Sequence, residues 1–573
     1  MREINQAAVG FGGRWQSLPL LQLWRDYERG WLGHDVLAGI SVCVVMIPSV
    51  IAYAELAGLP PVHGLYAALA GMIAYAFFAS SRQVIAGPDA AITLLVGTGI
   101  GVLAADDPSR APALAAVVAL LGGALMLIAS RLKIGVIADF LSKPVLVGYL
   151  SGAALILVST QVGKLFGLKI SGHNFFAVVF NLATHLRESH LLTLGLGLGL
   201  MVVLELLKRF APKIPGALVV FVLAIVVSVA LGLQARGVAV IGDVPQGLPG
   251  LRLPKVSLDM IGELFPAAVG ISLLTFPEGI LLARAFAAKN RYEIRPNQEL
   301  LALGVSNLAA GLFQGFSVGA SQSRTTVSDA TGGKTQMASL VAAGALILFL
   351  LFLTPLLRPL PVVTLAAILI FSGIHLIEIK AYRELFQISR PAFFLALLVT
   401  AGVLIVGVIP GILIGVMLSL IVLLGRLARP TDAVLSEVAK TGEFHDVGEA
   451  PEGQSVPGLI AYRFYAPLFF ANADYFVERI RGLVAASTAP VRWVLVDMQA
   501  VTDIDVTAAE AMSRLRQELE ERGILLKIAR ANRPLRERLA RIGLGEHLGE
   551  SNLFPSVHAG VAAFRQEQGK TGV

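Results

Sequence analysis

The 573-residue sequence contains few charged residues and a single cysteine, and both shortages exclude whole classes of protein. Asp, Glu, Lys and Arg make up 15% of the chain, against roughly 25% in ordinary soluble proteins, so a water-soluble globule of this size would lack polar surface. The lone Cys43 excludes a scaffold built on disulfides. Because 55% of the residues are hydrophobic, disordered and collagen-like chains are excluded as well.

Motifs for several kinds of chemistry are also missing. There is no GxxxxGKS/T loop, so nucleotide hydrolysis has no support, and we expect the protein not to be an enzyme. The histidines and the cysteine are too scattered to form a recognisable metal site, so no resident cofactor is expected. Residues 1–34 contain four arginines and no early apolar core, and we therefore expect no removable signal peptide.

What the chain has in abundance is hydrophobicity, with a mean hydropathy of +0.74. Its net charge of +7 and pI near 9.5 would suggest a nucleic-acid partner in a soluble domain. In so apolar a chain, the excess of Lys and Arg instead indicates residues that fix topology in a lipid bilayer, and no nucleic acid is expected. The composition is typical of a polytopic α-helical membrane protein.

Charge is distributed unevenly along the chain. Residues 431–573 hold 16 Lys and Arg and 19 Asp and Glu, which is about 24% and typical of a soluble domain. Residues 1–430 hold 30 basic and 20 acidic residues, about 12% of that part. The polar, Gly- and Pro-containing segment 442–457 is expected to be a linker or loop. The chain is therefore predicted to consist of an N-terminal segment (1–34), a transmembrane domain (35–430), and a linker with a soluble domain (431–573).

Fourteen apolar stretches, in two sets of seven, are candidates for membrane-spanning helices, each of which needs about 20 mostly apolar residues. Basic residues are about twice as frequent in the loops after even-numbered spans as in the other loops. The positive-inside rule then predicts a multi-pass protein of the cell (inner) membrane with both termini in the cytoplasm. The spans fall near residues 35–54, 62–79, 89–104, 112–130, 135–158, 191–207, 215–232, 260–284, 298–316, 322–331, 336–354, 360–376, 391–409 and 411–426.

The third and tenth candidate spans differ from ordinary spans. The third opens with Gly87-Pro88-Asp89 and continues as a short apolar run, and the tenth is a polar stretch (317–335) that lipid would not tolerate. Broken helices at matching places in two halves are a sequence sign of a transporter site. Since a helix N-terminus offers unpaired N–H groups and about half a positive charge, two facing ends would hold an anion. The alternative is a re-entrant loop with a structural role only.

Polar residues in the tenth span are candidates for contact with that anion. Arg324 would attract it, or would alternatively form a structural ion pair with Asp329 or Glu278, because an unpaired arginine in a membrane costs at least about 2.5 kcal/mol. Hydroxyl and amide donors at the presumed helix start would either bind the anion or cap the helix. These donors are Ser321, Gln322 and Ser323.

Glu278 follows Pro277 inside an otherwise apolar span. Burial in apolar surroundings favours the neutral carboxyl, so Glu278 is predicted to carry a coupling proton or to be balanced by a cation such as Na⁺. The alternative is a structural ion pair. Thr275 and Ser272 lie nearby as weaker candidates for oxygen ligands. Pro48 interrupts the first span, which leaves Ser49 and Tyr53 on one helical side toward the same cavity.

Five motifs in this order resemble the signature regions of SulP anion transporters, and the resemblance covers nearly the whole chain. It implies two inverted seven-helix repeats (about 35–232 and 257–428), core and gate domains, a homodimer, and an elevator-like mechanism with the anion between the third and tenth helices. The motifs are residues 48–66 (PSVIAYAELAGLPPVHGLY), 81–88 (SRQVIAGP), 278–286 (EGILLARAF), 297–300 (NQEL), and 323–325 (SRT) with 332–335 (GGKT).

The resemblance also implies roles for single residues. The acid matching Glu278 is tied to proton or sodium coupling in similar proteins. Many relatives carry a neutral residue where this chain has Asp89, and an ionised carboxylate there would repel an anion. Asp89 is therefore expected to be protonated when substrate is bound, to pair with Arg324, or to point away. The residues implied to line the cavity are Ser49, Tyr53, Asp89, Ala90, Ser323 and Arg324.

The tail alternates strand-like and helix-like segments, which predicts a small α/β sheet. Strands are expected at 458–465, 491–498 and 524–529, and helices at 473–483, 507–522, 533–542 and 556–565. Three segments (467–476, 497–511 and 553–564) resemble the STAS domain that ends SulP transporters, a surface for a cytoplasmic protein partner. Thr507 matches a phosphorylated hydroxyl of related proteins, but the neighbouring Ser-Gly pair is missing, which favours a helix cap over a switch.

Together these observations predict a secondary active transporter of a small inorganic or organic anion (sulfate, bicarbonate or a dicarboxylate), coupled to H⁺ or Na⁺ as a symporter. Two alternatives remain open. One is an uncoupled anion channel or exchanger, against which the buried acid Glu278 argues. The other is a membrane-anchored regulatory protein that acts through its STAS domain.

Overall fold

A computed structural model describes residues 27–571, apart from 134–141, 169, 171–174, 212–213, 439–442, 449–452 and 542–551. Most of the predicted N-terminal segment, 1–34, thus lies outside the described residues. The chain divides into two compact units, Met1–Ser419 and Leu420–Val573. The division falls inside helix α17 (Val408–Ala428), before the boundary expected at Pro430.

The first unit is helical, and a described helix lies at each of the fourteen predicted spans, although residues 135–141 of the predicted span 135–158 lie outside the described residues. Eight helices in the described part are long and apolar enough to cross a membrane, and four further apolar helices are shorter. The helices are α2 (Leu32–Leu56), α3 (Pro61–Phe78), α4 (Ala90–Gly101), α5 (Ala111–Arg131), α6 (Lys143–Leu165), α8 (Leu191–Phe210), α9 (Gly216–Leu231), α10 (Leu258–Asn290), α11 (Pro296–Leu312), α12 (Gln322–Ala330), α13 (Met337–Leu348), α14 (Val362–Leu376), α16 (Arg390–Val406) and α17.

Two further helices, α7 (Phe175–His185) and α15 (Ile379–Ile388), were not expected from the sequence. They follow α6 and α14, which are the fifth helices of the two sets. In α15, Ala381 and Leu385 are buried while Lys380 and Arg383 are exposed. Such an amphipathic helix has no continuous apolar run, so a search for membrane spans overlooks it.

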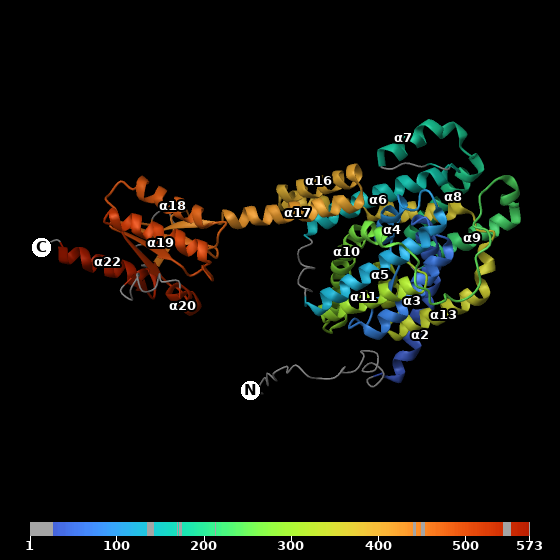
Figure 1. Ribbon diagram of the computed structural model, residues 1–573, viewed down its shortest axis with the longest axis horizontal. Coiled ribbons are helices and arrows are strands. Elements are labelled where there is room, and N and C mark those ends of the chain that lie inside the picture. The colour runs from blue at the N-terminus through green and yellow to red at the C-terminus, as the bar shows by residue number, and fades with distance from the viewer. Residues whose placement is uncertain are drawn as a thin grey trace. The chain divides into compact units, whose positions relative to one another are not determined.

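The short helices α4 and α12 begin where two distant chain segments meet. Strand β1 (Ala86–Gly87) pairs in antiparallel fashion with β2 (Gly319–Ala320), each directly before one of these helices. Around them, α5, α10 and α11 pack against one another, and α3 packs on α11 (Figure 1). A side chain at Gly319 would place its Cβ 2.2 Å from Ile92 Cδ1, so Ile92 would have to move if this glycine were replaced.

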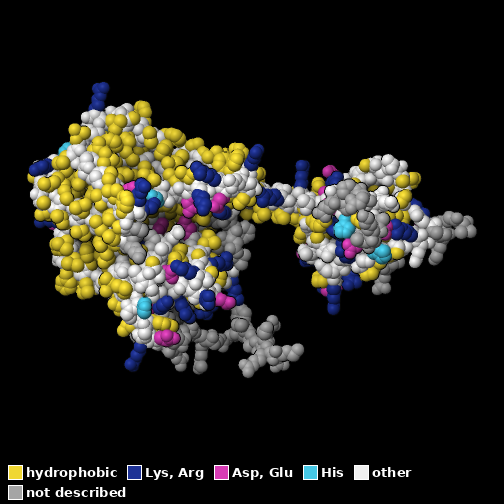
Figure 2. All heavy atoms as spheres, turned by 180° about the vertical axis from the view of Figure 1, so that it is seen from behind, with side chains coloured by type: hydrophobic (Ala, Val, Ile, Leu, Met, Phe, Trp, Pro, Cys, Tyr) yellow, Lys and Arg dark blue, Asp and Glu magenta, His cyan; other side chains and the backbone are white. Residues whose placement is uncertain are grey.

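Apolar side chains also cover much of the surface of this unit. Figure 2 shows one face of the molecule on which hydrophobic side chains predominate over the helical unit. Exposed large apolar residues occur along several helices, where they include Val226 and Val229 of α9 and Leu398 and Ile405 of α16. Apolar surface of this extent is unfavourable in water and is expected where helices face lipid.

The second unit contains a six-stranded sheet with the order β4-β3-β5-β6-β7-β8. Neighbours from β5 to β8 are parallel, and β3 is antiparallel to β4 and β5. Its elements are β3 (Asp432–Val438), β4 (Glu443–Asp446), β5 (Leu459–Phe464), α18 (Ala473–Ala486), β6 (Trp493–Asp497), α19 (Val506–Glu521), β7 (Leu525–Ala529), α20 (Arg533–Arg541), β8 (Leu553–Phe554) and α22 (Val557–Thr571).

The expected α/β alternation is present, but three strands were missed. Strand β4 lies in the segment 442–457 that was predicted to be a linker or loop, so that prediction is partly wrong. Its polar sequence suits an edge strand, which needs only backbone hydrogen bonds to one neighbour, here β3.

A buried cluster of charged residues lies in this unit where the parallel strands β5, β6 and β7 end. Asp497 is fully buried and forms ion pairs with Arg463 (2.6 Å) and Arg530. Burial alone would raise the pKa of Asp497, but hydrogen bonds and charge from Arg530 and Arg463 outweigh it and hold that pKa below its usual value.

Candidate functional site

The N-terminus of α4 is capped by Asp89. The backbone of Asp89 is extended (φ −130°, ψ 156°), and its Oδ1 accepts a hydrogen bond from the Ala91 N–H at 3.3 Å. The side chain is half-buried, and the next residue, Ala90, is buried. Gly87 and Pro88, which precede the cap, are also buried, so α4 starts within the unit rather than at its edge.

The N-terminus of α12 lies on the other side of the β1–β2 pairing. Ser321 occupies its cap position, and the Ser321 N–H donates to the Ile85 carbonyl at 3.0 Å. No side chain caps this helix, so the alternative role of the three donors as helix caps is wrong. Ser321 Oγ instead lies 3.3 Å from Ser323 Oγ. Gln322 and Ser323 are exposed, which leaves their polar groups accessible at the helix start.

Arg324 is almost completely buried, at 2% exposure, beside both helix starts. Its Nη2 donates to the Pro88 carbonyl at 2.8 Å, while its Nε has no hydrogen-bond partner in the described part of the chain. Gly87 makes room for it, because a Cβ there would lie 3.0 Å from Nη2. Arg324 lies within electrostatic range of Asp89 and of the Tyr53 hydroxyl.

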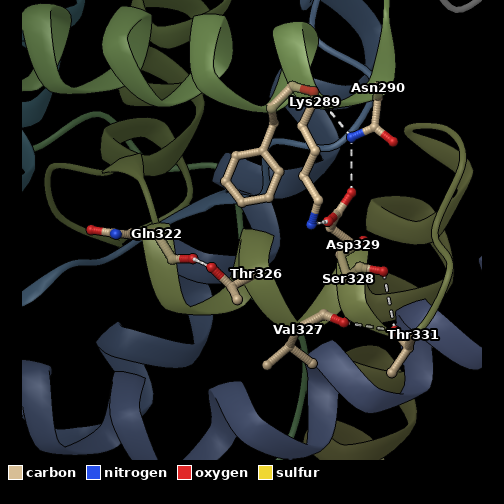
Figure 3. A network of polar contacts seen from close by, with 9 residues as sticks. Lys289, Asn290, Gln322, Thr326, Val327, Ser328, Asp329 and Thr331 are labelled. Carbon is tan, nitrogen blue, oxygen red and sulfur yellow. Dashed lines mark hydrogen bonds and ion pairs between the residues drawn. The ribbon is translucent and has the colours of Figure 1, made fainter.

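The structural ion pairs considered for Arg324 are not formed. Asp329 is bound by Lys289 Nζ at 2.5 Å and by Asn290 Nδ2 at 2.9 Å, and these two residues come from the end of α10 (Figure 3). Among the described residues, Glu278 makes no ion pair with Arg324 either. Among the described residues, the arginine charge is therefore not neutralised by a carboxylate in direct contact.

Glu278 lies on α10, directly after Pro277, and is half-buried. The described residues provide no hydrogen bond or ion pair to its carboxylate, so the alternative of a structural ion pair is not seen there. It interacts electrostatically with Asp89. Two acids in one site require protons or a cation if both are to be neutralised.

Three nearby oxygens complete the surroundings of these acids. The Tyr149 hydroxyl, on α6, is buried, has no hydrogen-bond partner among the described residues, and lies within electrostatic range of Glu278 and Asp89. Thr275 Oγ1 is also buried without a partner, whereas Ser272 Oγ donates to the Ala268 carbonyl at 2.7 Å. Tyr149 was missed in the sequence, although a tyrosine in an apolar span is a signal that could have identified it.

The remaining predicted residues lie on α2. Ser49 and Tyr53 are both half-buried, and Ser49 Oγ donates to the Val45 carbonyl at 3.3 Å. The structure thus brings Tyr53, Asp89 and Arg324 within electrostatic range of one another. The Asp89 carboxylate caps α4 and forms no hydrogen-bonded ion pair with Arg324.

Thr507 belongs to the other unit, where it is exposed in the first turn of α19. The prediction that it caps this helix is wrong, since the cap is Asp505, whose Oδ1 accepts from the Ala508 N–H at 2.8 Å. A carboxylate two residues earlier is at the right place to reach the free N–H groups of the first turn.

Family models match both units of the chain. The model described as the sulfate permease family matches residues 32–399, and the model of the STAS domain matches residues 450–560. These matches confirm the resemblance predicted from the five motifs and from the tail.

Two relatives illustrate the range of similarity. A probable sulfate transporter of Mycobacterium tuberculosis, MT1781, is 39% identical over 548 residues, covering 96% of this chain and 98% of that protein. The chloroplastic sulfate transporter 4.1 of Arabidopsis thaliana is 30% identical over 554 residues, covering 94% of this chain and 80% of that protein. Both are transporters and not enzymes.

Solved structures share the fold. The murine Solute Carrier 26 family member A9 anion transporter in its inward-facing state matches with a TM-score of 0.90 at 21% identity, covering 99% of this chain and 100% of that one. The transmembrane domain of the cyanobacterium bicarbonate transporter BicA matches with a TM-score of 0.59 at 23% identity, covering 69% of this chain and 97% of that one.

Proposed function

This chain belongs to the sulfate permease family of multi-pass membrane transporters, and we propose that it is a secondary active symporter of a small anion, coupled to H⁺ or Na⁺. Sulfate is the leading substrate, because the relatives that align over almost the whole chain are named sulfate transporters. The membrane part is proposed to span residues 35–430 and the STAS part residues 431–573.

The observation that carries the proposal is the setting of Arg324. This buried guanidinium lies where the N-termini of α4 and α12 meet across the β1–β2 pairing, and no carboxylate neutralises it in direct contact within the described chain. Two helix N-termini and one arginine provide N–H donors and positive charge to a multivalent oxyanion. Backbone donors recognise charge and size, which suits sulfate and equally a bicarbonate or dicarboxylate.

Coupling is assigned to Glu278 with the neighbouring Asp89. An anion with two negative charges beside two carboxylates is unfavourable unless protons or a cation enter with it. The unpartnered oxygens of Thr275 and Tyr149 add ligands that an Na⁺ ion would use. Cotransport therefore follows from the charge balance of the site.

The proposed architecture is two inverted repeats of seven helices, 35–232 and 257–428. The position of α7 and α15 after the fifth helix of each set supports this repeat. With both termini in the cytoplasm, α12 runs from the middle of the membrane to the cytoplasmic side. The exposed Gln322, Ser323 and Thr326 along its length fit a site open toward that side. We further propose that the protein lies in the inner membrane, forms a homodimer, and binds a cytoplasmic protein through its STAS domain.

Uptake into proteoliposomes tests this function. We expect labelled sulfate to accumulate inside vesicles under an inward H⁺ or Na⁺ gradient, with unlabelled bicarbonate and dicarboxylates as competitors. If only the H⁺ gradient or only the Na⁺ gradient drives sulfate accumulation, that ion is the coupling ion. Large anion currents without accumulation would instead support a channel, and no flux under any gradient would support the regulatory role.

A further inference from the structure

One partly buried ion pair joins two helices at their C-terminal ends. Lys164 Nζ lies 2.9 Å from Glu55 Oε1, and the two side chains are 30% and 23% exposed. Lys164 is in the last turn of α6, and Glu55 is in the last turn of α2. The second carboxylate oxygen of Glu55, Oε2, is buried and has no partner among the described residues.

The two helices belong to different packing groups. Helix α2 packs on α3, α12 and α13, so it belongs with the helix that carries Arg324. Helix α6 packs on α7, α14 and α16. Helix α2 also touches α9 and α14, so the groups are in contact elsewhere. The Glu55–Lys164 ion pair is a specific bond across this boundary.

The dipoles of the two helices act on the two charges in opposite ways. A carboxylate in the last turn of a helix faces the negative end of the helix dipole, which is unfavourable, whereas Lys164 is favourably placed at the end of α6. Since both side chains are mostly buried, solvent screens the attraction less than it screens a surface pair. Separating the pair exposes a carboxylate that the helix itself destabilises.

In the proposed topology, the pair lies at the outer end of the unit, opposite to the cytoplasmic side toward which the anion site is proposed to open. The helices α2 and α6 are the first and fifth of the first set, so they run in the same direction and both end on the outer side in the proposed topology. Helix α12 ends on the other side, where Asp329 binds Lys289. In this topology, the anion site is accessible from the cytoplasmic end of the unit. The Glu55–Lys164 ion pair connects the two helix groups at the outer end.

We propose that Glu55 and Lys164 are gating residues of the transport cycle: their ion pair closes the outer end of the anion pathway and opens in every cycle. This inference rests on the proposed transport function, in which the two helix groups move against each other. A bond across the moving boundary stabilises the conformation with a closed outer end, and outward opening has to break it.

Cross-linking tests the gate directly. In a Cys43→Ala background, Glu55→Cys with Lys164→Cys is treated with a short bifunctional thiol reagent that a reductant cleaves. We expect anion uptake into proteoliposomes to fall at least about tenfold on cross-linking and to recover on reduction, because the closed state is locked. Each single cysteine variant controls for the reagent.

A matched pair inside one group provides the control. Lys143 and Glu384 form an ion pair of 3.2 Å between α6 and α15, both in the α6 group. Cross-linking Lys143→Cys with Glu384→Cys joins elements that do not have to separate, so uptake should persist. Uptake that survives the Glu55–Lys164 cross-link would overturn the gate alone, whereas unmodified protein that moves no anion would overturn the proposed function as well.

Charge variants give an independent measurement. Glu55→Gln and Lys164→Gln each remove the ion pair, so the outward-open state gains population and the external half-saturation concentration should fall by about threefold to tenfold. Glu55→Lys combined with Lys164→Glu rebuilds the pair and should return it to near the starting value. Single variants with unchanged half-saturation, or a reversed pair that does not recover, contradict the proposal.

Discussion

Substitution of Gly87 by alanine should displace the Arg324 guanidinium without removing any charge. The new Cβ would lie 3.0 Å from Arg324 Nη2, closer than ordinary van der Waals contact, and 3.4 Å from Cζ. Because Arg324 is 2% exposed, the guanidinium has little room to retreat, and a shift by a few tenths of an ångström weakens its 2.8 Å hydrogen bond to the Pro88 carbonyl. The φ of Gly87, 155°, is also one that L side chains rarely adopt.

The expected loss follows from these two effects. A charge-assisted hydrogen bond contributes about 1.5–3 kcal/mol, so an anion that relies on the displaced guanidinium should bind about tenfold to hundredfold more weakly. The backbone strain costs about 1–3 kcal/mol and should lower the unfolding temperature of the membrane unit. Sulfate binding to the purified protein, measured by calorimetry, and thermal unfolding, measured by tryptophan fluorescence, report the two effects separately.

Gly101→Ala is the matched control, because this glycine ends the same helix α4 and a Cβ there meets nothing within 4 Å. It should leave both measurements unchanged. Sulfate affinity that is the same in Gly87→Ala as in the unmodified chain would refute the reasoning that Arg324 at this position holds the anion. If Gly101→Ala also lowered sulfate affinity, the loss in Gly87→Ala would be attributed to a change in helix α4 rather than to displacement of the Arg324 guanidinium.

Further substitutions address coupling and the tail. Glu278→Gln should abolish gradient-driven uptake while sulfate binding largely persists, since the amide carries no coupling ion; retained accumulation would reject that role. Deletion of 431–573 should lower assembly or rate, measured by size-exclusion chromatography and initial uptake, and a truncated protein unable to bind sulfate would contradict this division. The lowered pKa of Asp497 means that its stabilisation of the tail is present above about pH 4 and is lost as pH falls through the folded-state pKa. Asp497→Asn should destabilise the tail by about 3–5 kcal/mol at neutral pH and remove this acid dependence in circular dichroism melts, because Arg463 and Arg530 lose their partner; melts that match the unmodified chain at every pH would contradict it.

Most of the helical architecture was predictable because apolar runs are a local property. Each span predicted from hydropathy coincides with a helix, usually within a few residues at the ends. The exceptions are elements whose stability depends on neighbours. Helix α15 buries one face only, and strand β4 is held by its pairing with β3 rather than by its own composition.

The sequence singled out the residues of the candidate site but did not predict their contacts. Polar residues in an apolar region stand out in any sequence, and Glu278 and Arg324 were identified on that ground, whereas Asp89 was assigned to the cavity from the resemblance to SulP transporters. Their partners could not be chosen, because each had several plausible partners along the chain. The structure assigns Asp329 to Lys289 and not to Arg324, and it adds the buried Tyr149 hydroxyl.

The sequence by itself determined that this is a helical membrane protein with a soluble tail, and that two of its helices are broken at matching places. Hydropathy and charge of each segment decide those features, whatever the segment packs against. Only the tertiary structure decided that Ala86 pairs with Ala320 and that Arg324 donates to Pro88, 236 residues away. Such contacts form because the whole helical unit buries its surface together, and no local pattern encodes which distant groups that packing brings into reach.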